Sequence, residues 1–144
     1  NAYRRFQPGN HAPTESAWGY DNRTTAIRIP ESPAAARRIE HRVAGADANP
    51  YLVLAAVLAG IWHGIENSLQ APEPIVGNAW DQTIDAPALP TTMDQAIVAF
   101  DKAEPLSHYL SDQFKTLFLA TKQQEWNEFA GRVSEFELET YLRM

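Results

Sequence analysis

The chain has 144 residues, of which 44% are apolar and 10% aromatic, a composition typical of one globular domain or of part of a larger one. It contains no cysteine, which excludes disulfide bonds and metal sites built from thiolates. The net charge of −6 argues against a nucleic-acid-binding protein, because such proteins carry a broad Lys/Arg surface.

The beginning of the chain carries no recognisable targeting signal. The first residue is Asn1 rather than Met, which indicates a fragment or a processed chain. The opening NAYRRFQPGN lacks the apolar stretch of a secretory signal. The longest apolar run, YLVLAAVLAGIWHGI, is interrupted by His63 and is short for a membrane-spanning helix. We therefore expect a cytoplasmic protein without a membrane segment.

The first third of the chain is expected to form a loop followed by two strands. Residues 1–21 are interrupted by several prolines and glycines, which favours a loop. The segment RTTAIRIP (23–30) is rich in β-branched residues and predicts a strand. The segment RRIEHRV (37–43) predicts a second strand, which would pair with the first as a hairpin across a longer loop.

The remainder of the chain is expected to be mostly helical. Asn49 as an N-cap, followed by proline at the first helical position, predicts a buried core helix over residues 49–69. Residues 70–91 contain four prolines and show no periodicity. A loop of this length usually serves a function or wraps around a neighbour. Residues 92–144 contain apolar side chains at helical spacing and predict several helices.

Charge is distributed unevenly along the chain. Residues 1–43 contain seven arginines, no lysine and four acidic residues, a net charge of +3. Residues 44–144 contain five basic and fourteen acidic residues, a net charge of −9. The planar fork of arginine suits bidentate binding of carboxylate and phosphate groups. We therefore expect the first third to bind anions and the rest to serve as scaffold.

The segment RRIEHR (37–42) carries the densest charge. Side chains alternate between the two faces of a strand, so Arg38, Glu40 and Arg42 would share one face. His41 would lie on the opposite face. A carboxylate between two guanidinium groups can hold a divalent cation together with the anions that it bridges, as phosphoryl transfer requires. The alternative is an Arg–Glu–Arg ion-pair ladder on the surface.

Four motifs in this order resemble the C-terminal part of the catalytic domain of the glutamine synthetase family. They are NAYRRFQPG, NRTTAIRIP, ARRIEHRV and NPYLVLAAVLAGI, and they span residues 1–69, whereas residues 70–144 match only in general character. The resemblance implies an α+β fold with a few antiparallel strands, which form half of a barrel-like site, followed by helices packed outside. It divides residues 1–144 into an active-site loop with strands (1–48), the core helix (49–69), a loop (70–91) and a helical part (92–144).

The resemblance also implies a reaction and a set of site residues. The family joins the γ-carboxyl group of glutamate to an amine through γ-glutamyl phosphate, using ATP and Mg²⁺ or Mn²⁺. By position in the motifs, Arg5 and Arg42 would bind the substrate, and Arg28 and Arg38 would bind ATP. Glu40 would be a metal ligand, and Arg23 would contact the transferring phosphoryl group. The other metal ligands of the family lie on an earlier part of the domain, and its members assemble in stacked rings. We therefore expect the 144 residues to be inactive alone, and to act with the preceding part of the same chain in a homo-oligomer, without nucleic acid or membrane.

The loop after the first motif departs from the ammonia-using members of the family. In those members an aromatic residue and a glutamate follow Pro-Gly, and the glutamate takes a proton from ammonium, whereas this chain has Asn10 and His11. A neutral imidazole is a possible general base for an amine but cannot attract ammonium by negative charge. The segments RRFQPG and WGYDNRT resemble the γ-glutamylpolyamine (γ-glutamylputrescine) synthetase branch, so that activity is expected.

Several alternatives stay open at this point. They are an ammonia-using glutamine synthetase, a catalytically silent structural relative and an isolated anion-binding module. His11 could equally be an ordinary loop histidine. Trp18 and Tyr20 would line an amine or nucleotide pocket, or pack in the core.

Overall fold

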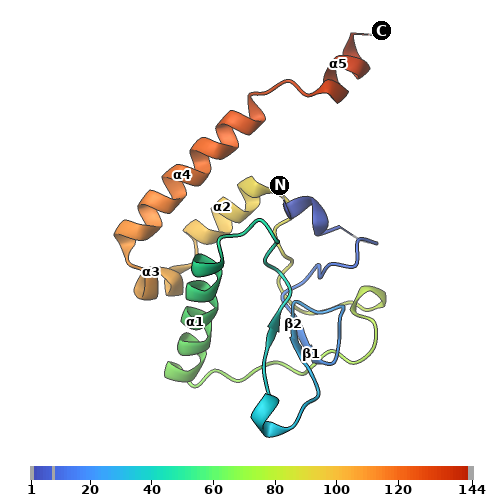
Figure 1. Ribbon diagram of the computed structural model, residues 1–144, viewed down its shortest axis with the longest axis vertical. Coiled ribbons are helices and arrows are strands. Elements are labelled where there is room, and N and C mark those ends of the chain that lie inside the picture. The colour runs from blue at the N-terminus through green and yellow to red at the C-terminus, as the bar shows by residue number, and fades with distance from the viewer. Residues whose placement is uncertain (1, 8, 143–144) are drawn as a thin grey trace.

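The structure, a computed structural model, describes residues 2–7 and 9–142 and places short strands before a series of helices (Figure 1). Three strands, β1 (Trp18–Tyr20), β2 (Ile27–Ile29) and β3 (Glu40–His41), form one sheet in the order β1-β2-β3. β2 and β3 pair antiparallel, which confirms the expected hairpin. β1 pairs with β2 in parallel and lies within a region expected to be loop. Asn1 and Pro8 of the first motif, and residues 143–144 of the helical part, lie outside the described residues.

The strands are shorter than their sequence patterns predict. The residues before β2 form a turn, because the Asn22 side chain accepts hydrogen bonds from the Thr24 amide (3.0 Å) and hydroxyl (2.6 Å). The buried Thr25 hydroxyl lies within hydrogen-bonding distance of the backbone oxygens of Asn22 (3.0 Å) and Ile27 (2.9 Å). Side chains of these types often replace strand pairing with local hydrogen bonds. A 3₁₀ helix, η2 (Ala34–Ala36), precedes β3, so β3 also begins later than its sequence pattern predicts.

Helix α1 (Pro50–Glu66) begins where the sequence predicts. The Asn49 side chain accepts hydrogen bonds from the amides of Tyr51 (3.0 Å) and Leu52 (3.3 Å), which confirms the N-cap. The helix ends three residues before the expected position, since Asn67 is its C-cap. Within the described residues Ala59 is the one buried residue of the helix, so the expected burial is not seen in these 144 residues. Its large apolar side chains stay exposed, among them Leu54, Leu58, Trp62 and Ile65.

Four further helices follow the segment 70–91. They are α2 (Met93–Asp101), α3 (Glu104–Leu110), α4 (Asp112–Ala130) and α5 (Glu135–Tyr141). α2 and α4 pack through Phe100 and Phe118, whose ring centroids are 5.2 Å apart. α4 extends away from the body of the molecule and carries α5 at its far end (Figure 1). None of the helices in the described residues is long and apolar enough to cross a membrane.

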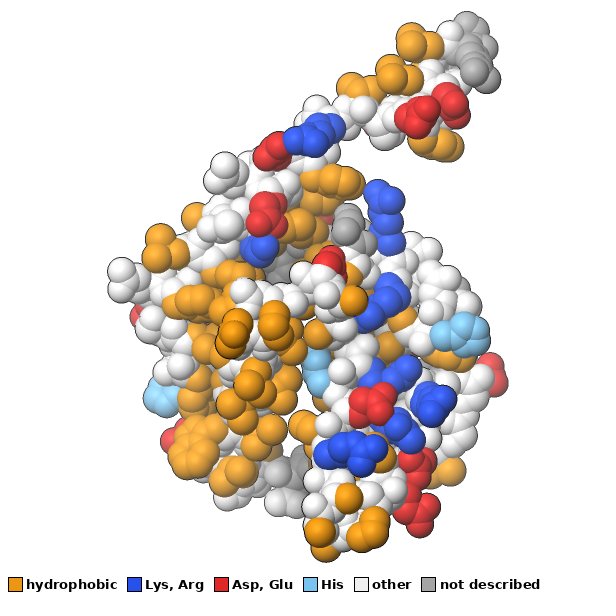
Figure 2. Space-filling model, in the orientation of Figure 1, with side chains coloured by type: hydrophobic (Ala, Val, Ile, Leu, Met, Phe, Trp, Pro, Cys, Tyr) orange, Lys and Arg blue, Asp and Glu red, His pale blue; other side chains and the backbone are white. Residues whose placement is uncertain are grey.

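The molecule exposes much more surface than a compact protein of its size. Its accessible surface is 10572 Å² for 16.1 kDa, whereas a compact monomer of that mass would expose about 7,400 Å². Apolar side chains cover the α1 side of the molecule, and Lys and Arg side chains gather over the strands (Figure 2). Within the described residues the buried apolar side chains are Phe6, Ala12, Pro13, Ala17, Ala26, Pro30, Ala59 and Ala79, so most large apolar side chains lie outside any core.

Candidate functional site

A cavity of about 200 Å³ lies between the loop that follows the 3₁₀ helix η1 (Ala2–Arg5) and strand β3. It brings together four of the residues expected at the site, namely Arg5, His11, Glu40 and Arg42. Asn10, His41 and the buried residues Ala12 and Pro13 complete its lining. The cavity thus collects four arginine or histidine side chains and one carboxylate from segments about 30 residues apart in the chain.

Glu40 lies at the centre of an ion-pair network. Its Oε2 atom accepts a hydrogen bond from Arg28 Nη1 (2.8 Å), and its Oε1 atom lies 3.2 Å from Arg42 Nε. Arg28 also donates through Nη2 to Asp21 Oδ1 at 2.6 Å. The register of the sheet causes the first contact, because Arg28 on β2 is directly opposite Glu40 on β3. The hydrogen bond from Arg28 lowers the pKa of the Glu40 carboxyl, so this group stays ionised at neutral pH.

The same hydrogen bonds act on the guanidinium. They raise the pKa of Arg28, chiefly through Glu40 and also through Asp21. Arg28 therefore remains positively charged at any pH at which the protein is folded.

The side chains of Arg5 and Arg42 join the segments that line the cavity through hydrogen bonds to backbone oxygens. Arg5 Nη2 donates to the backbone oxygen of Val43 (2.5 Å), so η1 is fastened to the end of β3. Arg42 Nη1 donates to the backbone oxygens of Arg23 and Thr25, the latter at 3.3 Å, and links β3 to the turn before β2. Among the described residues the Nε atoms of Arg5 and Arg28 are buried without an acceptor. Buried N–H donors of this kind are suited to an anionic ligand.

Three of the expected residues do not line this cavity. Arg28 adjoins it through its hydrogen bond to Glu40 but is not part of the lining. Arg23 is exposed and lines a second cavity of about 540 Å³ with Tyr20 and residues 74–78. Arg38 is exposed and donates through Nη1 to the backbone oxygen of Ala36 at 3.4 Å. The prediction of a shared Arg38–Glu40–Arg42 face therefore holds for Glu40 and Arg42 but fails for Arg38. The reason is that β3 begins only at Glu40, so Arg38 does not follow strand alternation.

His41 and Asn10 line the cavity although the sequence did not single them out. His41 was expected on the face of its strand that points away from the site, but it lines the cavity. A strand of two residues is too short for alternation of side chains to fix their directions. Burial lowers the pKa of the His41 imidazole, which favours its neutral form. Its Nδ1 atom is buried and has no hydrogen-bond partner within the described residues. The signal that might have identified it is its position beside Glu40 in the sequence.

Glu40 is the residue of the cavity that can act as a ligand of a divalent cation. The residues that the structure describes contain no group of three or more His, Asp or Glu side chains that could hold a metal ion. Glu40 nevertheless fits the role of one ligand, because its carboxylate is ionised and its side chain is 42% exposed. Mg²⁺ is commonly held by one or two carboxylates, with waters and substrate phosphates supplying the remaining oxygens. The described residues thus provide one part of a metal site.

Comparison with known proteins places the chain in one protein family. Residues 1–141 match the family model described as glutamine synthetase, catalytic domain. The chain is 43% identical over 143 residues to γ-glutamylputrescine synthetase PuuA of Escherichia coli (strain K12), covering 99% of this chain and 30% of that protein. It is 38% identical over 138 residues to γ-glutamylethanolamide synthetase GlnA4 of Streptomyces coelicolor, covering 96% of this chain and 29% of that protein.

A solved structure supports the fold independently. The structure described as apo GmaS without ligand superposes with a TM-score of 0.84 and 29% sequence identity. The alignment covers 99% of this chain and 32% of that chain. The chain therefore spans about a third of the length of the proteins that it matches.

Proposed function

The chain belongs to the glutamine synthetase family, and we propose that it is part of an ATP-dependent ligase that joins the γ-carboxyl group of glutamate to an amine through γ-glutamyl phosphate. The observation that carries the proposal is the cavity that Arg5, His11, Glu40 and Arg42 line together. A substrate carboxylate, a divalent cation and an attacking amine each have a suitable side chain there. An isolated anion-binding module would have no need of the histidine or the ionised carboxylate.

In the first step the γ-carboxylate of glutamate attacks the γ-phosphorus of ATP, and ADP leaves. Arg5 and Arg42 bind the glutamate, because both guanidinium groups lie at the cavity. The remaining arginines offset the negative charge of the phosphates, with Arg28 and Arg38 on ATP and Arg23 on the transferring phosphoryl group. Glu40 would hold part of the coordination of Mg²⁺ or Mn²⁺, which would supply further positive charge to the phosphates.

In the second step the amine nitrogen attacks the acyl carbon, and phosphate leaves as the amide bond forms. The attacking nitrogen must lose a proton. Two imidazoles line the cavity, His11 and His41, and the exposed His11 is the proposed acceptor. His11 is also the residue that distinguishes an organic amine from ammonium, since it offers no negative charge. A polyamine such as putrescine is the proposed acceptor, in line with the similarity to γ-glutamylputrescine synthetase PuuA.

The 144 residues are proposed to need further protein in order to act. The exposed apolar face of α1, with Leu54, Leu58, Trp62 and Ile65, supports a covering segment from the preceding part of the same polypeptide. The excess of about 3,000 Å² over a compact monomer is of the size that large permanent interfaces bury. We therefore propose an inactive isolated chain and an active cytoplasmic homo-oligomer built as stacked rings.

The test is ADP release by the full-length protein with glutamate, ATP and Mg²⁺. Ammonium is compared with putrescine, spermidine, spermine, ethanolamine and simple monoamines. Turnover with organic amines and little with ammonium is expected. Efficient turnover with ammonium would make the protein a glutamine synthetase, and no turnover with any acceptor would favour a silent relative.

A pair of variants examines His11 in the same assay. H11E restores the negative charge of ammonia-using members and is expected to raise turnover with ammonium relative to the organic amine. H11Q is the matched control, because it has a similar size and no titratable group, and it is expected to lower turnover with every acceptor. If H11E and H11Q behave alike, the charge at this position does not select the acceptor.

A further inference from the structure

The segment 70–91 contacts the loop of His11 through the side chain of Trp80. Trp80 lies on the short 3₁₀ helix η3 (Ala79–Asp81), 69 positions after His11 in the chain. Its indole Nε1–H donates to the backbone oxygen of Ala12 at 3.2 Å. Its ring meets the His11 imidazole edge to face, with the centroids 5.5 Å apart and the planes at 67°.

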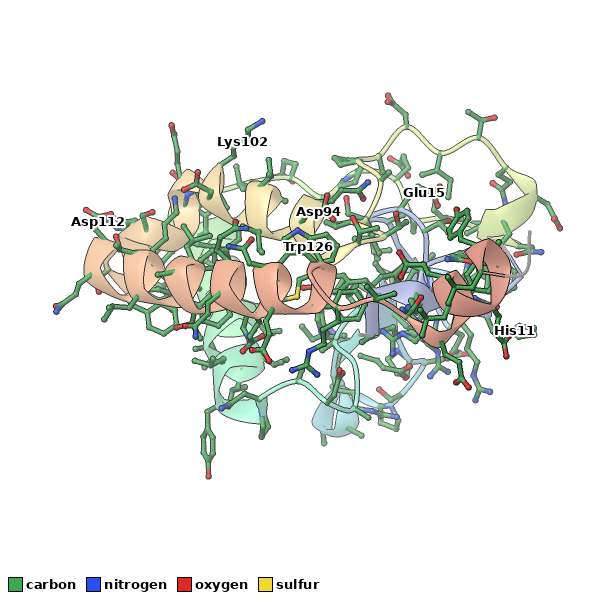
Figure 3. All side chains as sticks on the ribbon, turned by 90° about the horizontal axis from the view of Figure 1, so that it is seen from above. His11, Glu15, Asp94, Lys102, Asp112 and Trp126 are labelled. Carbon is green, nitrogen blue, oxygen red and sulfur yellow. The ribbon has the colours of Figure 1, made fainter. Side chains whose placement is uncertain are left out.

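His11 needs an external support of this kind. Its backbone has φ = 53°, in the left-handed region that non-glycine residues rarely adopt, and Gly9, two positions earlier, has φ = 88°. His11 is also exposed, so little of its side chain is fixed by packing. It lies at the opposite end of the molecule from Lys102 and Asp112, away from the junction of the helices (Figure 3). The Trp80 ring and the bond to Ala12 therefore restrain both the backbone and the ring of His11.

Trp80 is itself held firmly. Ala79 is buried, and its amide donates to the Thr24 hydroxyl at 2.9 Å. The Asn22 side chain donates to the backbone oxygens of Ile75 (3.0 Å) and Gly77 (2.8 Å). The turn that holds η3 and the residues before it through these hydrogen bonds also carries Arg23. Arg23 lines the second cavity. A chain of hydrogen bonds and one ring contact connects the turn of Arg23 to the loop of His11.

We propose that Trp80 is a positioning residue for the amine step: it holds His11 in the orientation in which the imidazole accepts the proton of the attacking amine. This inference rests on the proposed function. It adds a residue outside the four motifs that carry the family resemblance, from a segment that otherwise reads as connecting loop. The competing interpretation is that Trp80 only stabilises the packing of residues 70–91.

The experiment uses the full-length protein with W80F and W80A, and measures KM and kcat separately for the amine, glutamate and ATP. W80F keeps an aromatic ring and loses the N–H donor, and is expected to lower kcat/KM for the amine about threefold, as the loss of one hydrogen bond does. W80A removes both contacts and is expected to lower it about tenfold or more, because a misplaced group slows reaction steeply. KM for ATP and for glutamate is expected to stay within twofold.

Trp18 provides the matched control. Its indole Nε1–H donates to the backbone oxygen of Pro72 at 2.8 Å, so it fastens the same segment to β1. Its side chain lies outside the two cavities as lined by the described residues. W18F therefore removes an equivalent hydrogen bond without touching His11, and is expected to leave kcat/KM for the amine unchanged. Equal losses in W18F and W80F would show that packing of the segment explains the effect and would overturn the proposal.

A double-mutant cycle with H11Q isolates the contact. If Trp80 acts through His11, W80A costs little further activity once His11 is replaced, whereas fully additive losses would refute the proposal. The ring-proton shifts of His11 in an NMR spectrum provide a readout apart from activity, and the ring-current shift from Trp80 should vanish in W80A. Wild-type protein without amine turnover would refute the proposed function. Wild-type turnover that W80A leaves unchanged would refute the role of Trp80 alone.

Discussion

The turn before β2 depends on the hydroxyl of Thr25, and T25V tests this dependence. Thr25 is 1% exposed, and its hydroxyl lies 3.0 Å and 2.9 Å from the backbone oxygens of Asn22 and Ile27. Valine has nearly the same shape but no hydroxyl, so the substitution removes the hydrogen bonding and leaves the volume unchanged. A lost hydrogen bond with a buried acceptor left unsatisfied costs about 1–3 kcal/mol, and we expect the free energy of unfolding to fall by about that amount.

The assay is urea unfolding of the chain, followed by circular dichroism, with the midpoint and the slope fitted separately. T121V is the control: the Thr121 hydroxyl donates to the backbone oxygen of Leu117 at 2.9 Å on the exposed surface of α4. Water replaces that bond, so T121V should change the free energy of unfolding by less than about 0.5 kcal/mol. A loss in T25V no greater than that in T121V would refute the reasoning that burial makes the Thr25 hydroxyl important.

Three further predictions concern the cap of α1, the cavity histidine and the proposed metal ligand. N49A removes the acceptor of two amides at the start of α1 and should lower the free energy of unfolding by about 1 kcal/mol in the same assay; an unchanged midpoint would show that the cap is dispensable. Burial lowers the folded pKa of His41 below its ordinary value of 6.5, so the unfolded chain binds more protons just below that pH. The free energy of unfolding should therefore decrease as pH falls from 7 through 6.5 towards the folded pKa, and H41Q should remove this part of the pH dependence; an equal slope in H41Q would contradict the assignment. E40Q should raise the Mg²⁺ concentration for half-maximal ADP release by the full-length protein by about tenfold or more, since it removes the carboxylate charge, and an unchanged titration would mean that Glu40 is not a ligand.

Features with a local physical cause were predictable from the sequence. The start of α1 is an example, because an asparagine followed by proline supplies an acceptor for the first free amides and a preset backbone angle. The β2–β3 hairpin follows similarly from two β-branched or alternating segments separated by a loop. The four ordered motifs predicted the family, and the comparisons confirm it.

Features that depend on several segments were predicted poorly. The apolar composition of α1 predicted a core helix. Burial of a helix depends on the segments that pack against it, and within the described residues Ala59 alone is buried. Strand alternation placed Arg38 beside Glu40, whereas the register across the sheet places Arg28 there. Parallel pairing of β1 with β2 was missed because a three-residue strand has too few positions to show a period.

By itself, the sequence determined the family, the start of α1 and the set of charged side chains from which a site is assembled. These properties reside in neighbouring residues, whose backbone preferences and hydrogen bonds act over a few positions. Only the tertiary structure decided which of those side chains meet: Glu40 with Arg28 and Arg42, Arg23 at a separate cavity, and Trp80 against His11. The physical reason is that the contacts of Glu40 with Arg28 and of Trp80 with His11 join residues 12 and 69 positions apart. Their geometry is set by sheet register and packing rather than by spacing along the chain.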